Sequence, residues 1–321
     1  MNKQEILEIL EMPAEAFYNE IAPKAFEQFL NRKGRTLDVY SMLGYSNICK
    51  NRCLYCGMRA GSPIPRYRMT EEEILDAGLK AALKGFHHLF LISGEDPGYS
   101  FDALLRIVEK LHENGLSLSL AIGEMEPEKY LQLHAAGAEE YVMKFEMSHE
   151  DSFNRLNPST NFRKRMDCIE KIAAAGLKLA SGNIVDWPGQ TLDELADDIV
   201  LMQELKISWA PVIPYMPAKG TPLALEGGPG SLEKIHKEIA ILRLSMPDIQ
   251  ITAQQPGRDL KKGLADTAGN LEAIRCGANL LFYDLLPEAQ AKDFHVIDER
   301  NLTENGRWNA LAEAIGGNVR K

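Results

Sequence analysis

The chain has 321 residues, of which 45% are hydrophobic and 26% charged, and its formal net charge is −10. This composition is ordinary for a globular protein, and no apolar run approaches the roughly 18 residues that a membrane span needs. A nucleic-acid-binding protein normally carries a basic surface, so the 46 acidic against 36 basic residues argue against a nucleic-acid partner. The first residues are polar and contain no signal-peptide core, so we expect a cytoplasmic protein.

Apolar runs typical of strands alternate with amphipathic helical stretches, as in parallel α/β sheets. Residues 3–32 are predicted to be helical. Eight strands are predicted, at 37–43, 88–93, 116–122, 139–146, 177–185, 208–215, 249–254 and 279–284. Helices are predicted between them, at 70–84, 101–114, 126–136, 163–175, 191–205, 231–245 and 269–275. Thr70 and Thr191 each stand three residues before a glutamate, which is the capping-box pattern that opens a helix.

Eight strands, each but the last followed by a helical segment, predict an α/β fold with a (β/α)8 barrel of the TIM type. Such a barrel typically takes about 250 residues, which matches residues 36–285. We therefore expect a helical extension at 1–35, the barrel at 36–285, and a short C-terminal tail with a helix packed on the barrel at 286–321. In these barrels the functional residues follow the C-terminal ends of the strands.

Three of the five cysteines lie close together in the loop after the first predicted strand: Cys49, Cys53 and Cys56, spaced C-x3-C-x2-C. In a reducing compartment such a group is typical of metal binding. A structural zinc site takes four protein ligands, and a 4Fe–4S cluster is normally held by four cysteines. Neither a fourth cysteine nor a histidine lies nearby, so one metal position is left for a ligand that is not protein. Cys168 and Cys276 are isolated and are interpreted as core residues.

With the aromatic Tyr55 before its last cysteine, this motif resembles the signature of the radical S-adenosylmethionine (SAM) enzymes. The resemblance implies a 4Fe–4S cluster whose open iron binds the amino and carboxylate groups of SAM. It further implies one-electron cleavage of SAM to a 5′-deoxyadenosyl radical, fed by an electron donor such as flavodoxin or ferredoxin. The cofactors expected on this basis are the cluster and SAM.

Several residues at the ends of the predicted strands are candidates for binding SAM. Gly94 and Glu95 match a Gly-Gly-Glu-like segment that receives the SAM amino group in this superfamily. Glu146 is a candidate acceptor for the ribose hydroxyls or the amino group, and the fork of Arg165 suits the carboxylate. The complete predicted set is Tyr55, Gly94, Glu95, Glu124, Glu146, Arg165 and Asn183.

A second group of polar residues is predicted to face the substrate. Lys144 lies two residues before Glu146, on the same strand face, so it is either an anion contact for substrate or the partner of Glu146 in an internal ion pair. Paired cationic and acidic groups favour a small zwitterion such as an amino acid. The predicted catalytic and substrate-facing residues are Lys144, Asp186, Tyr215, Met216, Gln254, Gln255 and Arg258.

Over residues 36–285 the chain resembles the biotin synthase-like branch of the radical SAM enzymes. It is most similar to the HydE family of [FeFe]-hydrogenase maturases and next to the PylB family of methylornithine synthases. The segments that carry this resemblance are 46–47, 66–70, 93–97, 188–191, 221–224 and 275–279. The resemblance implies a complete barrel with the substrate deep inside it.

The chain also departs from these families. HydE-type proteins often carry a C-terminal cysteine group, but this chain has no cysteine after Cys276. Segments 144–147 and 186–187 depart from the HydE pattern, and segment 252–259 matches neither family. The SAM-binding half is therefore retained while the substrate half differs. Hydrogenase maturation is therefore not expected. Sulfur insertion of the biotin synthase kind is not expected either, because its second cluster needs further barrel cysteines.

Two classes of function follow from these features. The first is a single-cluster radical SAM enzyme acting on a small substrate inside the barrel. Its radical would abstract hydrogen, with rearrangement or fragmentation, or add to sulfur. The alternative is a non-catalytic iron–sulfur or zinc-binding assembly factor.

Overall fold

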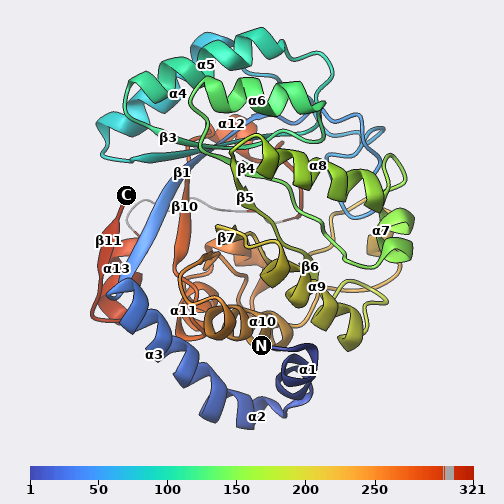
Figure 1. Ribbon diagram of the computed structural model, residues 1–321, viewed down its shortest axis with the longest axis vertical. Coiled ribbons are helices and arrows are strands. Elements are labelled where there is room, and N and C mark those ends of the chain that lie inside the picture. The colour runs from blue at the N-terminus through green and yellow to red at the C-terminus, as the bar shows by residue number, and fades with distance from the viewer. Residues whose placement is uncertain (299, 301–306) are drawn as a thin grey trace.

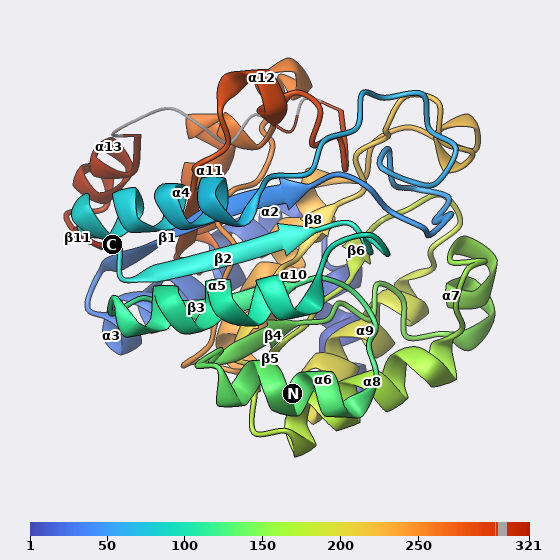
Figure 2. The ribbon, with the colours of Figure 1, turned by 90° about the horizontal axis from the view of Figure 1, so that it is seen from above.

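The computed structural model describes residues 1–298, 300 and 307–321. Parallel strands form a barrel wall with helices outside it (Figure 1). The strands are β1 (Thr36–Ser46), β2 (His88–Ser93), β3 (Ser117–Ala121), β4 (Glu140–Val142), β5 (Lys178–Ala180), β6 (Ile184–Val185), β7 (Trp209–Ala210), β8 (Ile213–Pro214), β9 (Gln250–Ile251), β10 (Leu280–Asp284) and β11 (Asn318–Arg320). In Figure 2, β1 and β2 run side by side in the same direction.

Continuous ladders cover most of the barrel wall. One ladder runs through β10, β1, β2, β3, β4 and β5, and another pairs β7 with β9. Individual backbone hydrogen bonds join the two, from Ser208 N to Leu179 O (2.7 Å) and from Ala253 N to Leu280 O (2.7 Å). The short strands β6 and β8 pair with each other farther along the chain from β5 and β7. The predicted α/β barrel fold is confirmed, with single bonds in place of ladders on one side.

The helices between the barrel strands lie where the sequence predicts them, with one addition. They are α1 (Lys3–Glu11), α2 (Ala14–Ala16), α3 (Ala22–Lys33), α4 (Glu71–Leu83), α5 (Phe101–Glu113), α6 (Pro127–Ala135), α7 (Glu150–Leu156), α8 (Phe162–Ala174), α9 (Leu192–Glu204), α10 (Leu232–Ser245), α11 (Thr267–Arg275), α12 (Glu288–Ala291) and α13 (Arg307–Ala314). A π-helical turn at Phe17–Ile21 joins α2 to α3. Both predicted capping boxes are present, at Thr70 and Thr191. Helix α7 was not predicted.

Four predicted strands are shorter than expected. The strand predicted at 139–146 ends at Val142, and Glu146 has a left-handed φ of 63°, which extended backbone does not allow. The strands predicted at 177–185 and 208–215 each split into two short pieces. The strand predicted at 249–254 is reduced to β9, because polar side chains replace the ladder beyond Ile251.

Two apolar clusters surround the strands. The smaller one, inside the barrel, includes Phe90, Val142, Trp209 and Phe282, contributed by four different strands. The larger one lies between the strands and the helices. Because alternate residues of a strand face opposite sides, strands buried on both faces read as continuous apolar runs in the sequence.

The N-terminal helices cover one side of the barrel. Helix α1 packs on α9 and α10, and α3 packs on α10 and α11 (Figure 1). The division at residues 35 and 285 remains a prediction, and within the predicted tail residues 299 and 301–306 lie outside the described part of the chain. Strand β11, which was not predicted, pairs with β1.

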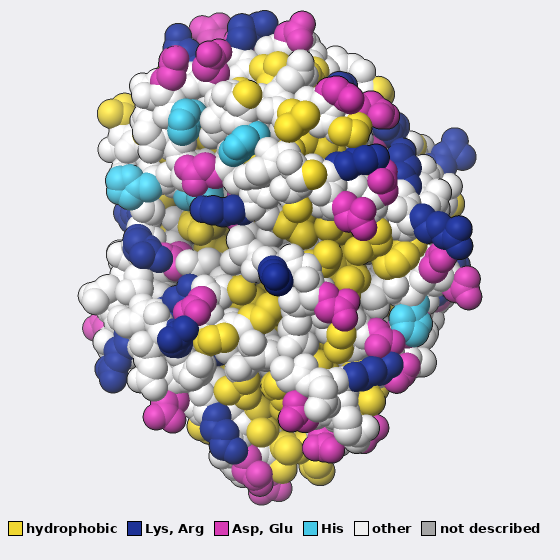
Figure 3. Space-filling view, viewed as in Figure 1, with side chains coloured by type: hydrophobic (Ala, Val, Ile, Leu, Met, Phe, Trp, Pro, Cys, Tyr) yellow, Lys and Arg dark blue, Asp and Glu magenta, His cyan; other side chains and the backbone are white. Residues whose placement is uncertain are grey.

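The surface carries charges of both signs. Figure 3 shows acidic and basic side chains interspersed over one face. In the described part of the chain, no helix is both long enough and apolar enough to cross a membrane.

Candidate active site

The three clustered cysteines lie in the loop after β1 and are free thiols. Gly94, directly after β2, allows this loop to approach the neighbouring strand. A Cβ at Gly94 would lie 2.4 Å from the Ile48 carbonyl oxygen and 2.7 Å from Cys49 Cβ. Gly94 is therefore a close-approach position beside the first cysteine, because no larger residue fits there.

The three cysteine sulfurs are not gathered around a single point as the ligands of one metal ion would be. Among the described residues, the only three candidate ligand atoms within 4.8 Å of one another belong to His149, Asp193 and Asp197. At least one pair of sulfurs in the cysteine loop is therefore more than 4.8 Å apart, which is wider than the about 3.8 Å set by tetrahedral zinc with Zn–S bonds of ~2.3 Å. A four-iron cluster binds each thiolate to a different iron, so it accommodates wider spacing.

Burial disfavours the thiolate form of these cysteines. It raises the pKa of Cys49 and Cys56, and it raises the pKa of Cys53 to about 12. Thiolates become stable in such surroundings when a cationic metal centre binds them. This donor set therefore fits an iron–sulfur cluster with one open iron.

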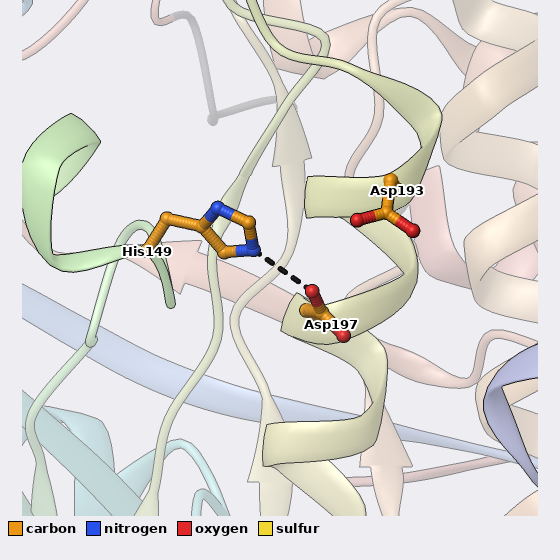
Figure 4. A group of neighbouring side chains, drawn as sticks. All are labelled: His149, Asp193 and Asp197. Atoms are coloured by element: carbon orange, nitrogen blue, oxygen red, sulfur yellow. Dashed lines mark hydrogen bonds and ion pairs between the residues drawn. The ribbon is translucent and has the colours of Figure 1, made fainter.

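The group of His149, Asp193 and Asp197 is an ion-pair cluster between the residue before α7 and the helix α9. Figure 4 shows the hydrogen bond from the His149 ring to Asp197, which is 2.8 Å long. The ammonium of Lys3 lies 2.9 Å from Asp193 and 2.7 Å from Asp197. Because Lys3 already pairs with both carboxylates, we assign no metal to them.

A cavity of about 330 Å³ opens beside the cysteine loop, at the C-terminal ends of the strands. Six of the predicted residues line it, together with Cys56: Tyr55, Lys144, Glu146, Arg165, Tyr215 and Met216. The rest of its wall is largely apolar. The structure thus brings the cysteine loop and six of the fourteen predicted site residues to one cavity.

Lys144 and Glu146 form an ion pair on the cavity wall, with 2.9 Å between Nζ and Oε2. Their side chains are 20% and 15% exposed. Hydrogen bonds from Glu146 N to Gly182 O and from Ile184 N to Glu146 O, both 3.1 Å, hold the left-handed backbone. Lys144 and Glu146 therefore pair with each other in this structure, and a role of Lys144 as an anion contact for substrate stays a prediction.

Arg165 is held by Glu124. Its Nε donates to Glu124 Oε1 at 2.9 Å, and Thr160 also donates to this carboxylate. Burial alone would raise the pKa of Glu124, but Arg165, Thr160 and Lys164 outweigh it, so the pKa lies below its ordinary value. Glu124 lies outside the cavity and positions the guanidinium that reaches it.

Glu95 lies in a smaller adjoining pocket. Its Oε1 accepts from Glu124 N at 3.0 Å, and Lys50 lies 3.2 Å from Oε2. Gly123, with φ 93°, makes room for it, since a Cβ there would lie 1.9 Å from Glu95 Cγ. The acid predicted to receive the SAM amino group is thus fixed one strand away from the cysteine loop.

Two tyrosines line the cavity in different ways. Tyr55 donates to Asn157 Oδ1 at 2.7 Å, which anchors its ring beside the last cysteine. The buried hydroxyl of Tyr215 has no partner among the described residues. Burial raises the pKa of Tyr215 to about 12, so this hydroxyl stays protonated.

Asn183 and Asp186 bond to protein groups behind the cavity wall. The Asn183 amide donates to Asp198 and Glu238. The Asp186 carboxylate accepts from Ser231 N and from Lys234 Nζ.

The remaining three follow β9 and also lie away from the cavity. Gln254 and Gln255 donate to the backbone oxygens of Phe282 and Val212 and so replace strand pairing. Arg258 lines a separate cavity of about 580 Å³ beside the N-terminal helices. The structure therefore does not bring these three to the substrate position, because side-chain polarity alone does not indicate which face of the wall a residue occupies.

Most residues of the cavity wall were not predicted from the sequence. Phe90 and Trp209 lie within predicted strands, where an apolar side chain gives no distinct signal of a cavity. Val296 and Ile297 also line the cavity, and Gly57 N donates to Val296 O at 3.1 Å. No local pattern could have linked this late segment to the cysteine loop.

Comparison with known proteins agrees with this geometry. Residues 43–202 match the family model of the radical SAM superfamily. The chain is 32% identical over 273 residues to the [FeFe] hydrogenase maturase subunit HydE of Thermotoga maritima, covering 84% of this chain and 76% of that protein. It is 27% identical over 268 residues to 3-methylornithine synthase of Methanosarcina acetivorans, covering 82% and 73%.

A solved structure shares the fold. The crystal structure of methylornithine synthase (PylB) aligns with a TM-score of 0.85 at 22% identity, covering all of this chain and 94% of that one. These similarities support a SAM-cleaving enzyme and not the non-catalytic factor considered as the alternative. The cofactors are a 4Fe–4S cluster and SAM. The chain belongs to the radical SAM superfamily.

Proposed function

We propose that this enzyme uses a 5′-deoxyadenosyl radical to act on a small, amino-acid-like substrate held in the barrel cavity. When bound, the 4Fe–4S cluster and SAM supply that radical. The observation that carries the substrate class is the Lys144–Glu146 ion pair on an otherwise largely apolar wall. A zwitterion can bind both members, with its carboxylate on Lys144 and its ammonium on Glu146, so neither charge is left unpaired.

The size of the cavity also supports a small substrate. Ligand pockets usually measure about 300–1,000 Å³, and this one, at about 330 Å³, must also admit part of SAM. The unpartnered hydroxyl of Tyr215 offers a further polar contact. The apolar wall keeps water away from a radical and strengthens the polar contacts.

We assign the remaining site residues by position. Cys49, Cys53 and Cys56 hold the cluster, with Gly94 and Glu95 beside them. Tyr55 and Arg165 are proposed as SAM contacts, because both line the cavity next to Cys56. The reaction removes a hydrogen atom from a substrate carbon, followed by rearrangement or fragmentation, or joins the adenosyl group to a substrate sulfur.

The surface around the cysteine loop supports an acidic electron donor, such as flavodoxin or ferredoxin, in the cytoplasm. Lys50, Arg52 and Lys164 are exposed there, although the chain as a whole carries a charge of −10. Opposite charges steer association at low salt.

Anaerobic reconstitution with reductant, SAM and amino acids deuterated on carbon tests the substrate proposal. We expect 5′-deoxyadenosine that has gained deuterium, detected by mass spectrometry. Lys144→Met should lose the deuterium transfer while retaining slow SAM cleavage without substrate, and the exposed Lys171→Met serves as its control. Formation of 5′-deoxyadenosine that does not respond to any amino acid would contradict the substrate class, though not the enzyme class.

Replacing a cluster ligand tests the metal assignment. Cys53→Ala should abolish the cluster absorbance and the formation of 5′-deoxyadenosine. Cys168→Ala is the matched control, because Cys168 is buried in α8 away from the loop, and it should retain about four irons per chain. An unchanged iron content in Cys53→Ala would overturn the assignment.

A further inference from the structure

Two carboxyl groups are buried together behind the cavity wall. Asp198 on α9 and Glu238 on α10 are 1% and 0% exposed. Both accept hydrogen bonds from Nδ2 of Asn183, at 3.1 and 3.4 Å. Among the described residues no basic side chain forms a salt bridge with either, and a buried carboxyl without a cation is costly.

Asp198 receives donors from three different loops. Its Oδ1 accepts from Ser148 N at 2.7 Å, in the loop after β4. Its Oδ2 accepts from Asn183, after β5, and from Gln190 Nε2 at 3.0 Å, after β6. One carboxylate therefore ties together three consecutive loops at the active-site end of the barrel.

Two of these loops contain strained residues. Glu146 and Asp186 have left-handed φ values of 63° and 58°, each costing about 1–3 kcal/mol unless neighbouring groups hold it. Glu146 lies two residues before Ser148, and its backbone bonds to the residues on either side of Asn183. Asp186 N donates to Gln190 Oε1. The strained backbone at Glu146 is thus connected to Asp198 through Ser148 and Asn183, and the strained backbone at Asp186 is connected to it through Gln190.

The hydrogen bonds distinguish the protonation states of the two acids. Three donors point at Asp198, which favours its carboxylate form. Glu238 receives one long hydrogen bond, and its Oε1 has no partner among the described residues. Burial, followed by the charge of Asp198, raises the pKa of Glu238 well above its usual range. Burial also raises the pKa of Asp198, to about 7.

Other charged groups near this pair act on it without bonding to it. The charge of His149 lowers the pKa of Asp198, and that of Lys144 lowers the pKa of Glu238. On the outward side of α9, Asp193 and Asp197 pair with Lys3 of α1.

We propose that Asp198 is a positioning residue of the active site, whose carboxylate holds the loops that present Lys144 and Glu146 to the cavity. Glu238 carries the proton that allows two buried acids to share the Asn183 amide. Protonation of Asp198 removes an acceptor, leaves one of three donors unpaired, and allows the strained loops to relax. The proposal rests on the roles of Lys144 and Glu146 given above. Its tests measure either the formation of 5′-deoxyadenosine from SAM or the spectrum of the unreacted protein, so neither test depends on the identity of the substrate.

Infrared spectroscopy of the unreacted protein tests the protonation states directly. At pH 8 the wild type should show a protonated carboxyl band, which disappears in Glu238→Gln and persists in Asp198→Asn. As the pH falls through about 7, a second such band should grow in the wild type and not in Asp198→Asn. Absence of the first band, or of the second in the wild type, would overturn the proposal even if a variant fails to fold.

The pH profile of 5′-deoxyadenosine formation tests the positioning role. Wild-type kcat/KM for SAM should fall as the pH drops below about 7, since the carboxylate is then lost. Asp198→Asn should be roughly tenfold lower and lack this fall, because hydrogen bonds to a charged group are lost at every pH. Asp193→Asn, on the outward side of the same helix, should keep the wild-type profile. An Asp198→Asn enzyme with wild-type kcat/KM and an unchanged acid limb would contradict the proposal.

Discussion

At the scale of single residues, the site depends on the absence of side chains as much as on their presence. Gly94 and Gly123 each border an acid or cysteine that a Cβ would displace. Both follow the C-terminal ends of strands, where neighbouring loops converge. These glycines set how closely the cysteine loop, Glu95 and the third strand's loop can approach one another.

Gly94→Ala should therefore disturb the cluster. The added methyl group meets backbone atoms that cannot rotate away, so we expect the free energy of unfolding to fall by about 1–3 kcal/mol, with reduced iron content. Denaturant titration and iron analysis measure both effects. A Cβ at Gly228 meets nothing within 4 Å, so Gly228→Ala is the control, and equal behaviour of the two variants would contradict this explanation.

At the scale of elements, the first turn of α8 is fastened to the loop after β3. The ion pair of Arg165 and Glu124 connects them, and the two side chains are 10% and 4% exposed. Because both charges are buried, removing one leaves the other uncompensated. The pair therefore fixes where α8 begins and where the guanidinium meets the cavity.

Arg165→Met should lower the free energy of unfolding by about 3–5 kcal/mol at neutral pH. Since the folded pKa of Glu124 is depressed, this stabilisation is present above the unfolded pKa of about 4.3 and is lost as the pH falls through the folded value. The difference in the free energy of unfolding between variant and wild type should then become smaller in acid. Arg163→Met removes an 84% exposed guanidinium and should change stability by less than about 1 kcal/mol. A difference in the free energy of unfolding that stays constant with pH would contradict the role given to Glu124.

At the scale of the whole molecule, Asp38 of β1 links strands where the ladder of the barrel wall is interrupted. Its carboxylate is 3% exposed and accepts from Arg320 of β11, from Gln250 of β9 at 2.7 Å, and from Asn279 at 3.2 Å. Side chains thus join β9, β1 and β11 on the side where β9 and β10 share individual bonds only.

Asp38→Leu should destabilise the barrel by about 3 kcal/mol or more, because several hydrogen bonds to one buried charge are lost together. Thermal unfolding measures this. Asp248→Leu, which removes a 70% exposed carboxylate paired with Arg32, should cost less than about 1 kcal/mol. Comparable losses in the two variants would show that Asp38 does not link the strands.

The sequence predicted the barrel well because its strands are buried on both faces, and β2 was located to the residue. The cysteine loop and the cavity-facing residues Lys144 and Glu146 followed from strand ends and alternation. Asn183, Gln254 and Gln255 do not line the cavity, since a polar residue beside a parallel strand can bond to other protein groups as readily as to a ligand. The left-handed backbone of Glu146 and Asp186 was invisible, because neither is a glycine.

The contact of residues 294–297 with the cysteine loop also has a consequence for how the protein is made. A ribosome adding about 5–20 residues per second would synthesise the cysteine loop roughly ten to fifty seconds before the segment that covers it. During that interval the thiols are open on the side where Val296 and His295 later lie against Gly57. Delivery of iron and sulfur to the nascent chain would therefore meet less obstruction than repair of the finished protein, whose cluster lies beneath a segment that must first lift away.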